Sequence, residues 1–279
     1  TTIVYIGVIF SSFCFTKWIK KIGVEWRVHT ASKNKSPLDP FLDEKKEDII
    51  LKAFSVKKAP CVAITINSPG GSPVQSHLIY NFIRQQAEKN KKKVIVFAED
   101  VAASGGYLIA CAGDEIYANS SSIIGSIGVI YSSFGFTELI KKIGVERRVH
   151  TAGKNKSTLD PFLDEKKEDI ERLKNIQLDL HKDFIEVVEK SRGSKLKKLE
   201  LELFSGEFWS GSKAKELGLI DEVGDANKVL REKFGENIVI KKFEKSKGWL
   251  SRKLSSSNDN LDQLANILDE KSVWQRYGL

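Results

Sequence analysis

The sequence contains no methionine and only three cysteines among its 279 residues. The cysteines (Cys14, Cys61 and Cys111) are odd in number, lie in apolar stretches and lack the spacing of metal ligands. This excludes a disulfide framework and a cysteine-based metal site. We interpret the cysteines as buried thiols and expect no metal and no cofactor.

Long hydrophobic runs are also missing. The most apolar opening stretch, Val4 to Phe15, is shorter than the ~20 residues that a membrane-spanning helix requires. We therefore predict that it forms a strand. The chain begins at Thr1, and no basic segment followed by an apolar core marks a signal peptide.

Charge of one sign does not dominate, because 45 basic residues are mixed with 37 acidic ones for a net charge of +8. Such mixing argues against a nucleic-acid partner. The basic run from Lys89 to Lys93 is typical of a solvated turn. A second basic cluster near Trp249 either contacts anionic lipid or is a plain wet surface, and comprises Lys241, Lys242, Lys245 and Lys247.

The chain contains an internal duplication. Residues 6–49 match residues 127–170 at 37 of 44 positions, with a constant offset of 121. Two copies separated by unrelated sequence do not form a solenoid, which needs at least three stacked units. The pairs that differ include Cys14 and Gly135, Trp26 and Arg147, and Ser32 and Gly153, and just outside the match Tyr5 stands opposite Ser126.

Strand-like runs rich in valine and isoleucine alternate with helical patterns, which indicates an α/β fold. The expected strands cover residues 61–67, 94–99, 115–118, 123–131 and 146–151. The expected helices cover residues 74–89, 164–190 and 195–203, and a further helix begins at Asp225. Residues 255–260 are typical of a polar linker, and residues 261–279 of a short amphipathic tail.

Two glycine-containing turns between a strand and a helix are candidate sites. Gly70 and Gly71 follow an apolar strand, so their backbone N–H groups are suited to hold a developing oxyanion, although a plain tight turn has the same pattern. Ser104 precedes Gly105 and Gly106 in a similar turn. It is a candidate nucleophile, while the ordinary alternative is a helix N-cap.

A nucleophilic serine needs a base, and none of the four histidines has an obvious role. A Ser-Lys pair is a recognised alternative to the Ser-His-Asp triad. A lysine in that role must lose its proton, which burial favours.

The ordered strings INSPGGSPVQS, AEDVAASGGYLIACAGDEIYA, SSIIGSIGVI, GVERRVHTAGKNKSTLDPF and FSGEFWSGSKAKELGLIDEVGD resemble the signal peptide peptidase A (SppA/SohB) family of serine peptidases. The resemblance covers residues 50–243. It implies an α/β fold of the Clp-protease/crotonase type, with a repeated ββα core and a helical C-terminal part. It also implies peptide hydrolysis by a Ser-Lys dyad.

The family nucleophile falls on Ser104, and its general base falls on Lys156, which we prefer to Lys154. The serine that orients this lysine falls on Ser126. The oxyanion donors fall on Gly70 or Gly71 and on Gly105. In single-domain members of the family a neighbouring subunit contributes the lysine, so the resemblance also implies a ring-like homo-oligomer.

We therefore expect a serine endopeptidase whose partners are extended apolar peptides, such as signal-peptide remnants or membrane-derived fragments. Two alternatives are a non-catalytic scaffold whose assembly the duplication impairs, and an acyl-CoA enzyme of the crotonase type. Membrane association is expected to be peripheral or through an anchor that precedes Thr1. The expected divisions are a duplicated segment (1–49), a peptidase domain (50–243) and a basic linker with an amphipathic tail (244–279).

Overall fold

A computed structural model describes residues 2–9, 44–197 and 203–243 of the chain. Most of the expected segment 1–49 and all of 244–279 lie outside these residues, as do Cys14, Lys35, Lys245, Lys247 and Trp249. The division of the chain into these segments stays a prediction.

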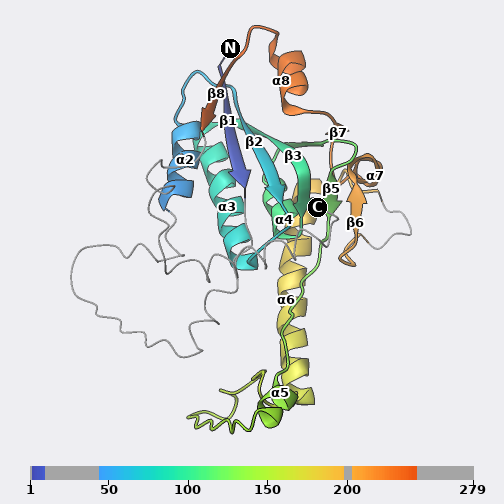
Figure 1. Cartoon of the computed structure of the whole chain (residues 1–279). Coiled ribbons are helices and arrows are strands. Elements are labelled where there is room, and N and C mark those ends of the chain that lie inside the picture. Colours follow the sequence, from blue (N-terminus) through green and yellow to red (C-terminus); the bar gives the residue numbers. More distant parts are fainter. Residues whose placement is uncertain (1, 10–43, 198–202, 244–279) are drawn as a thin grey trace, which may run out of the picture.

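The fold is α/β, as the sequence predicts, and is built on a mostly parallel eight-stranded sheet (Figure 1). The main strand order is β6-β5-β3-β2-β1-β8, and β4 pairs with β3 and β7. Among the described strands, only β5 and β6 pair in antiparallel fashion. The strands are β1 Thr2–Ile9, β2 Cys61–Ser68, β3 Lys93–Ala103, β4 Glu115–Ala118, β5 Ile123–Gly125, β6 Phe208–Ser210, β7 Glu222–Val223 and β8 Val239–Phe243.

Helices cover both faces of the sheet. Their bounds are α2 Glu44–Phe54, α3 Pro73–Asn90, α4 Gly105–Ala110, α5 Thr137–Lys142, α6 Lys167–Arg192, α7 Gly211–Leu217 and α8 Ala226–Phe234. Alternation along β3 explains the two layers, because successive side chains of a strand point to opposite faces. Val94 and Val96 join the main core, whereas Ile95 joins the cluster that α8 covers through Leu230.

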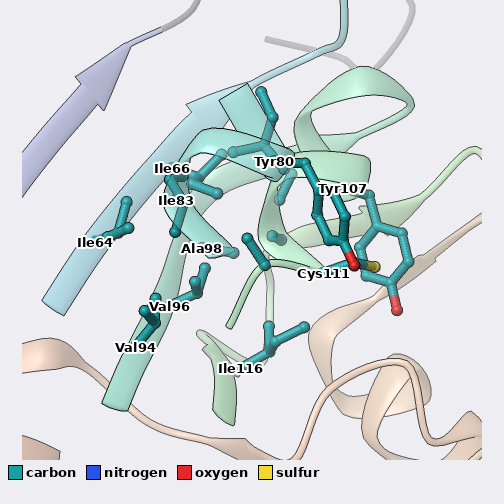
Figure 2. Close-up of a cluster of buried hydrophobic side chains, with 14 of the residues drawn as sticks. Ile64, Ile66, Tyr80, Ile83, Val94, Val96, Ala98, Tyr107, Cys111 and Ile116 are labelled. Carbon is teal, nitrogen blue, oxygen red and sulfur yellow. The ribbon is translucent and has the colours of Figure 1, made fainter. Parts of the chain in front are cut away.

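The main core lies between β2, β3 and the helices α3 and α4. Figure 2 shows Ile64 and Ile66 of β2 close to Ile83 of α3, with Tyr107 of α4 in the same cluster. These side chains are all nearly inaccessible to solvent. Burial on this scale, at about 25 cal/mol per Å² of apolar surface, anchors both strand-to-helix turns that follow β2 and β3.

Helix α6 extends well beyond the sheet and carries α5 and its neighbouring loops at the far end (Figure 1). We call residues 131–172 the arm. The arm exposes large apolar side chains at more than a third of their surface, namely Tyr131, Phe134, Leu139, Ile143, Val145, Val149, Leu163 and Ile170.

Several expected elements are confirmed and others are wrong. The expected strand over 123–131 is only three residues long, and no strand forms over 146–151, where the chain lies exposed in the arm. The expected helix over 195–203 lies partly outside the described residues, and residues 195–197 are not helical. The helix predicted to begin at Asp225 is α8, and the Asp225 side chain caps it by accepting a hydrogen bond from the Lys228 amide.

The basic run after α3 is not simply a solvated turn. Lys91 takes a left-handed conformation that ends α3. The Lys92 ammonium donates hydrogen bonds to the carbonyl oxygens of Phe54 and Val56, at 2.8 and 2.6 Å. Burial lowers the Lys92 pKa. Lys92 therefore ties the end of α2 to the sheet, a role that a charge run does not reveal.

Candidate active site

Ser104 lies between the end of β3 and the start of α4, in a conformation that is unusual for a residue with a side chain. Its φ is 51° and its ψ is −123°. The Ser104 amide donates a 2.8 Å hydrogen bond to the Gly125 carbonyl of the neighbouring strand β5. Ser104 occupies the N-cap position of α4, but its hydroxyl makes no capping hydrogen bond. The turn therefore presents the hydroxyl outward rather than using it to cap the helix.

Gly70 and Gly105 let two backbone segments approach Ser104. A Cβ atom on Gly70 would lie 2.9 Å from the Cβ of Ser104 and 3.2 Å from its Oγ, and Gly70 has a φ of +124°. A Cβ atom on Gly105 would lie 2.4 Å from the Ser76 hydroxyl and 3.3 Å from the Gly71 nitrogen. The structure thus brings Gly70, Gly71 and Gly105 together around Ser104.

The backbone amides of these glycines are not equivalent. The Gly70 amide donates a 3.3 Å hydrogen bond to the Ser68 hydroxyl. Within the part of the chain that the structure describes, the Gly71 amide makes no hydrogen bond. Gly105 is the first residue of α4, where an amide has no partner inside the helix. Gly71 and Gly105 therefore offer the free donors of this loop.

Ser126 lies at the end of the strand beside Ser104. Strands β3 and β5 pair in parallel with Ala103 opposite Gly125, so each serine follows one member of that pair. Ser126 is 7% exposed, has a φ of 53° and donates its amide to the Glu207 carbonyl at 2.7 Å. The two serines therefore leave the sheet at the same edge.

Lys156 is not brought to this edge within one chain. It lies between α5 and α6, in the part of the arm that Figure 1 shows at the end of α6 remote from the sheet. Lys156 is exposed, and it does not line the pocket that contains Ser104. Its amide donates to the Gly153 carbonyl at 3.2 Å, and Gly153 has a φ of +107°.

Contacts inside the arm order the loop that carries Lys156. The Arg147 guanidinium pairs with the Asp160 carboxylate at 2.6 Å and lies 4.7 Å from the centre of the Phe162 ring. The Phe162 ring lies 5.6 Å from that of Phe136. The corresponding residue of the first copy, Trp26, has no guanidinium to make the ion pair.

A pocket of about 90 Å³ opens beside Ser104. It is lined by Gly71, Pro73, His77, Ser104, Gly105, Leu108, Gly128, Val129, Ile130, Leu180 and Phe184. Most of these side chains are apolar. His77 is a member of the site that the sequence analysis missed. Its position four residues after Pro73, in a helix that begins at the glycine turn, is the signal that places it on the pocket side.

A second histidine, His181, contacts the segment that forms one wall of the pocket. The Nε2 atom of His181 on α6 lies 3.1 Å from the Ile127 carbonyl oxygen. Ile127 follows Ser126 directly and begins the segment that forms one wall of the pocket. This contact joins α6 to that wall.

The described thiols are buried, as predicted, and are poor nucleophiles. Burial raises the pKa of Cys61 to about 11 and that of Cys111 to about 12. A thiol with such a pKa is almost entirely protonated near neutral pH, whereas the thiolate is the reactive form. Cys61 and Cys111 are therefore poor candidates for a catalytic nucleophile.

A family model for peptidase family S49 matches residues 86–236, more than half of the chain. The chain belongs to peptidase family S49. The resemblance to signal peptide peptidase A is thereby confirmed. The match spans β3, α4, the arm, α6 and α8, and includes Ser104, Ser126 and Lys156.

Named relatives match this chain over part of their length. Protease 4 of Haemophilus influenzae is 35% identical over 195 residues, which cover 66% of this chain and 29% of that protein. The chloroplastic serine protease SPPA of Arabidopsis thaliana is 35% identical over 191 residues, which cover 66% of this chain and 27% of that protein.

A third relative is named as a protein of another class, a transporter rather than a protease. The Na(+)/H(+) antiporter NhaA of Brucella abortus is 55% identical over 244 residues, which cover 83% of this chain and 33% of that protein. The chain thus spans a third or less of the length of these three relatives, whose names describe the whole proteins. Within the described residues, no helix is both long enough and apolar enough to cross a membrane.

Proposed function

We propose that this chain is a serine endopeptidase that hydrolyses extended, largely apolar peptides with a Ser-Lys dyad. The observation that carries the proposal is the turn at Ser104, whose hydroxyl makes no cap and which lines an apolar pocket together with Gly71 and Gly105. A strained turn between a strand and a helix is a recurrent way to expose a nucleophilic serine.

The chemistry follows from these groups. The Ser104 Oγ attacks the carbonyl carbon of the scissile peptide bond while its proton passes to the neutral Lys156 amine. The Gly71 and Gly105 amides hold the oxyanion that forms. The carbon–nitrogen bond then breaks, the lysine returns the proton to the leaving amine, and water hydrolyses the acyl-enzyme. Ser126 orients the lysine amine from the neighbouring strand.

The base comes from a second copy of the chain in this proposal. Lys156 lies on the arm, between α5 and α6, and does not line the pocket of its own chain. Exposed apolar patches of this kind mark interaction sites. The exposed Phe134, Leu139 and Ile143 of the arm thus support docking onto a neighbouring copy, with Lys156 carried to the neighbour's Ser104.

The apolar pocket supports an apolar substrate. Leu108, Leu180 and Phe184 are among the residues that line it. Burying an apolar substrate side chain against them stabilises the complex. An extended peptide would pair by strand addition with a free strand edge near the site. Signal-peptide remnants and membrane-derived fragments have this chemistry, and association with a membrane surface would place the enzyme near them.

Replacing the nucleophile tests the proposal. Ser104→Ala should reduce hydrolysis of an apolar reporter peptide to background and leave the circular dichroism spectrum unchanged, because it removes one oxygen. Unchanged turnover would remove Ser104 from the mechanism.

The rate of the unsubstituted chain should rise toward alkaline pH, since the lysine acts only when neutral. A rate limb centred near pH ~6.5 would instead indicate a histidine base. An inactive chain that does not assemble would favour the scaffold alternative.

A further inference from the structure

The pocket beside Ser104 is walled by residues spaced four apart on three segments. Residues with this spacing share one face of a helix. Two such pairs lie within helices, Pro73 and His77 at the start of α3 and Leu180 and Phe184 on α6, while Ser104 precedes α4 and Leu108 lies within it. The register of each helix therefore aims His77 into the same space as the Ser104 hydroxyl.

His77 is chemically distinct from the rest of this wall. Apart from Ser104, His77 is the one residue of the lining whose side chain carries groups that can donate or accept a hydrogen bond. Its ring makes no hydrogen bond or ion pair to any residue within 2–9, 44–197 and 203–243, and it is only half-buried. A polar ring that faces an otherwise apolar pocket gains a partner only from water or from whatever enters the pocket.

We propose that His77 selects the substrate side chain that enters this pocket, and that it favours an apolar stem ending in a carboxamide, as in glutamine. A neutral imidazole has one donor nitrogen and one acceptor nitrogen, and a carboxamide offers both an acceptor and donors. Either tautomer of His77 therefore finds a partner on glutamine, whereas leucine, of similar size, leaves the ring unpaired. The inference rests on the proposed function, because it takes Ser104 as the nucleophile.

The residue selected is the one that supplies the scissile carbonyl. The pocket begins at Ser104 and Gly105, which meet that carbonyl in the proposed reaction. The side chain on the acyl side of the scissile bond is one atom away from this carbonyl, so it is the side chain that reaches the pocket directly. The rest of the pocket favours any apolar side chain at this substrate position. His77 restricts that preference to side chains that can also hydrogen-bond to its ring.

Affinity measured without turnover tests this role. Two fluorescent peptides that differ only by glutamine or leucine at this position are titrated onto the Ser104→Ala chain by anisotropy. The glutamine peptide should bind about two- to tenfold more tightly, the range expected for one net hydrogen bond. This preference should disappear in Ser104→Ala/His77→Leu. It should persist in Ser104→Ala/Asn81→Leu, which changes an exposed residue of the same helix.

Other outcomes are equally decisive. An unchanged preference in the His77→Leu chain, or no preference in its parent, would overturn the role of His77. His77→Phe keeps a flat ring without a hydrogen-bonding group and replaces His77→Leu if the latter does not fold, with the same loss expected. A glutamine preference that depends on His77, in a chain that cleaves neither peptide when Ser104 is restored, would contradict the proposed peptidase activity alone.

Discussion

Ser104 and Ser126 show how single residues define the site. Each follows one member of the Ala103–Gly125 pair and has a positive φ, which costs roughly 1–3 kcal/mol for a residue with a side chain. Hydrogen bonds from their amides to Gly125 and Glu207 hold the two turns in place. Packing of the strands thus offsets the strain and directs both residues away from the sheet.

Gly70 provides a prediction at this scale. Gly70→Ala should lower the free energy of unfolding by about 1–3 kcal/mol, because its φ of +124° suits glycine and the new methyl group would lie 2.9 Å from the Ser104 Cβ. Peptidase activity should fall as well, since Ser104 must shift. Chemical denaturation and reporter hydrolysis measure the two effects.

Gly135→Ala is the matched control for stability. No atom lies within 4 Å of the methyl group that this substitution adds. The free energy of unfolding of the Gly135→Ala variant should stay within about 0.5 kcal/mol of that of the unsubstituted chain. Equal stability of both variants would contradict the close packing at Gly70.

The sequence predicts the glycines and Ser104 because their turns have a local signature, but it leaves Gly70 and Gly71 undecided. The choice depends on the Ser68 hydroxyl, which engages the Gly70 amide only in the folded loop. His77 was missed for a related reason. Helical periodicity places it on a face of α3, but only the packing of α4 and α6 shows that this face lines the pocket.

At the scale of elements, the duplication separates local sequence from structure. The same four residues, IGVI, occur at 6–9 and at 127–130. The first set pairs in register with Ile64 to Asn67 of β2 and forms a strand, whereas the second set leaves β5 and reaches the pocket. Neighbouring strands decide between the two outcomes. This is why the strand predicted over 123–131 is much shorter than expected, while β2, which lies between β1 and β3, matches its prediction.

An ion pair between elements yields the next prediction. Arg192, 1% exposed at the end of α6, pairs with Asp221 at 2.7 Å, and Lys195 pairs with the same carboxylate. Burial alone would raise the Asp221 pKa, but hydrogen bonds from Arg192 and Lys195 lower it overall. Asp221→Asn should therefore cost about 3–5 kcal/mol of stability, because it leaves the buried guanidinium without a counter-charge.

The pH dependence of stability follows from the direction of this shift. Because folding lowers the Asp221 pKa, its contribution is present above the unfolded carboxyl pKa of ~3.9 and is lost as the pH falls through the lower folded value. Unfolding measured between pH 7 and pH 2 should show a smaller acid destabilisation in Asp221→Asn. Glu138→Gln, which breaks the exposed pair with Lys141, should cost much less stability, because solvent screens an exposed pair. Similar losses in both variants would contradict the role of the buried pair.

Within one chain, the nucleophile and the expected base lie on different parts of the molecule. Ser104 lies at the edge of the sheet, and Lys156 lies on an arm with an exposed apolar surface (Figure 1). The sequence supplies both residues through family resemblance, but their separation within one chain follows only from the length and direction of α6. In the proposed enzyme, each assembled site is therefore shared between two copies of the chain.

The first copy offers a natural comparison. Lys35 lies in the same Lys-Asn-Lys-Ser string as Lys156, although outside the described residues. The second copy depends on Gly153 at a φ of +107° and on the Arg147–Asp160 pair, and the first copy has Ser32 and Trp26 at the equivalent positions. We therefore expect Lys35→Ala to keep its activity and Lys156→Ala to lose it.

Mixing two inactive variants tests the shared site most directly. Ser104→Ala keeps its lysine and Lys156→Ala keeps its serine, so co-assembled chains should contain some intact sites and recover reporter hydrolysis, while each variant alone stays inactive. Lys35→Ala serves as the active control. An inactive mixture of demonstrably co-assembled chains would contradict a site shared between copies. Activity retained in Lys156→Ala but lost in Lys35→Ala/Lys156→Ala would show instead that the first copy supplies the base.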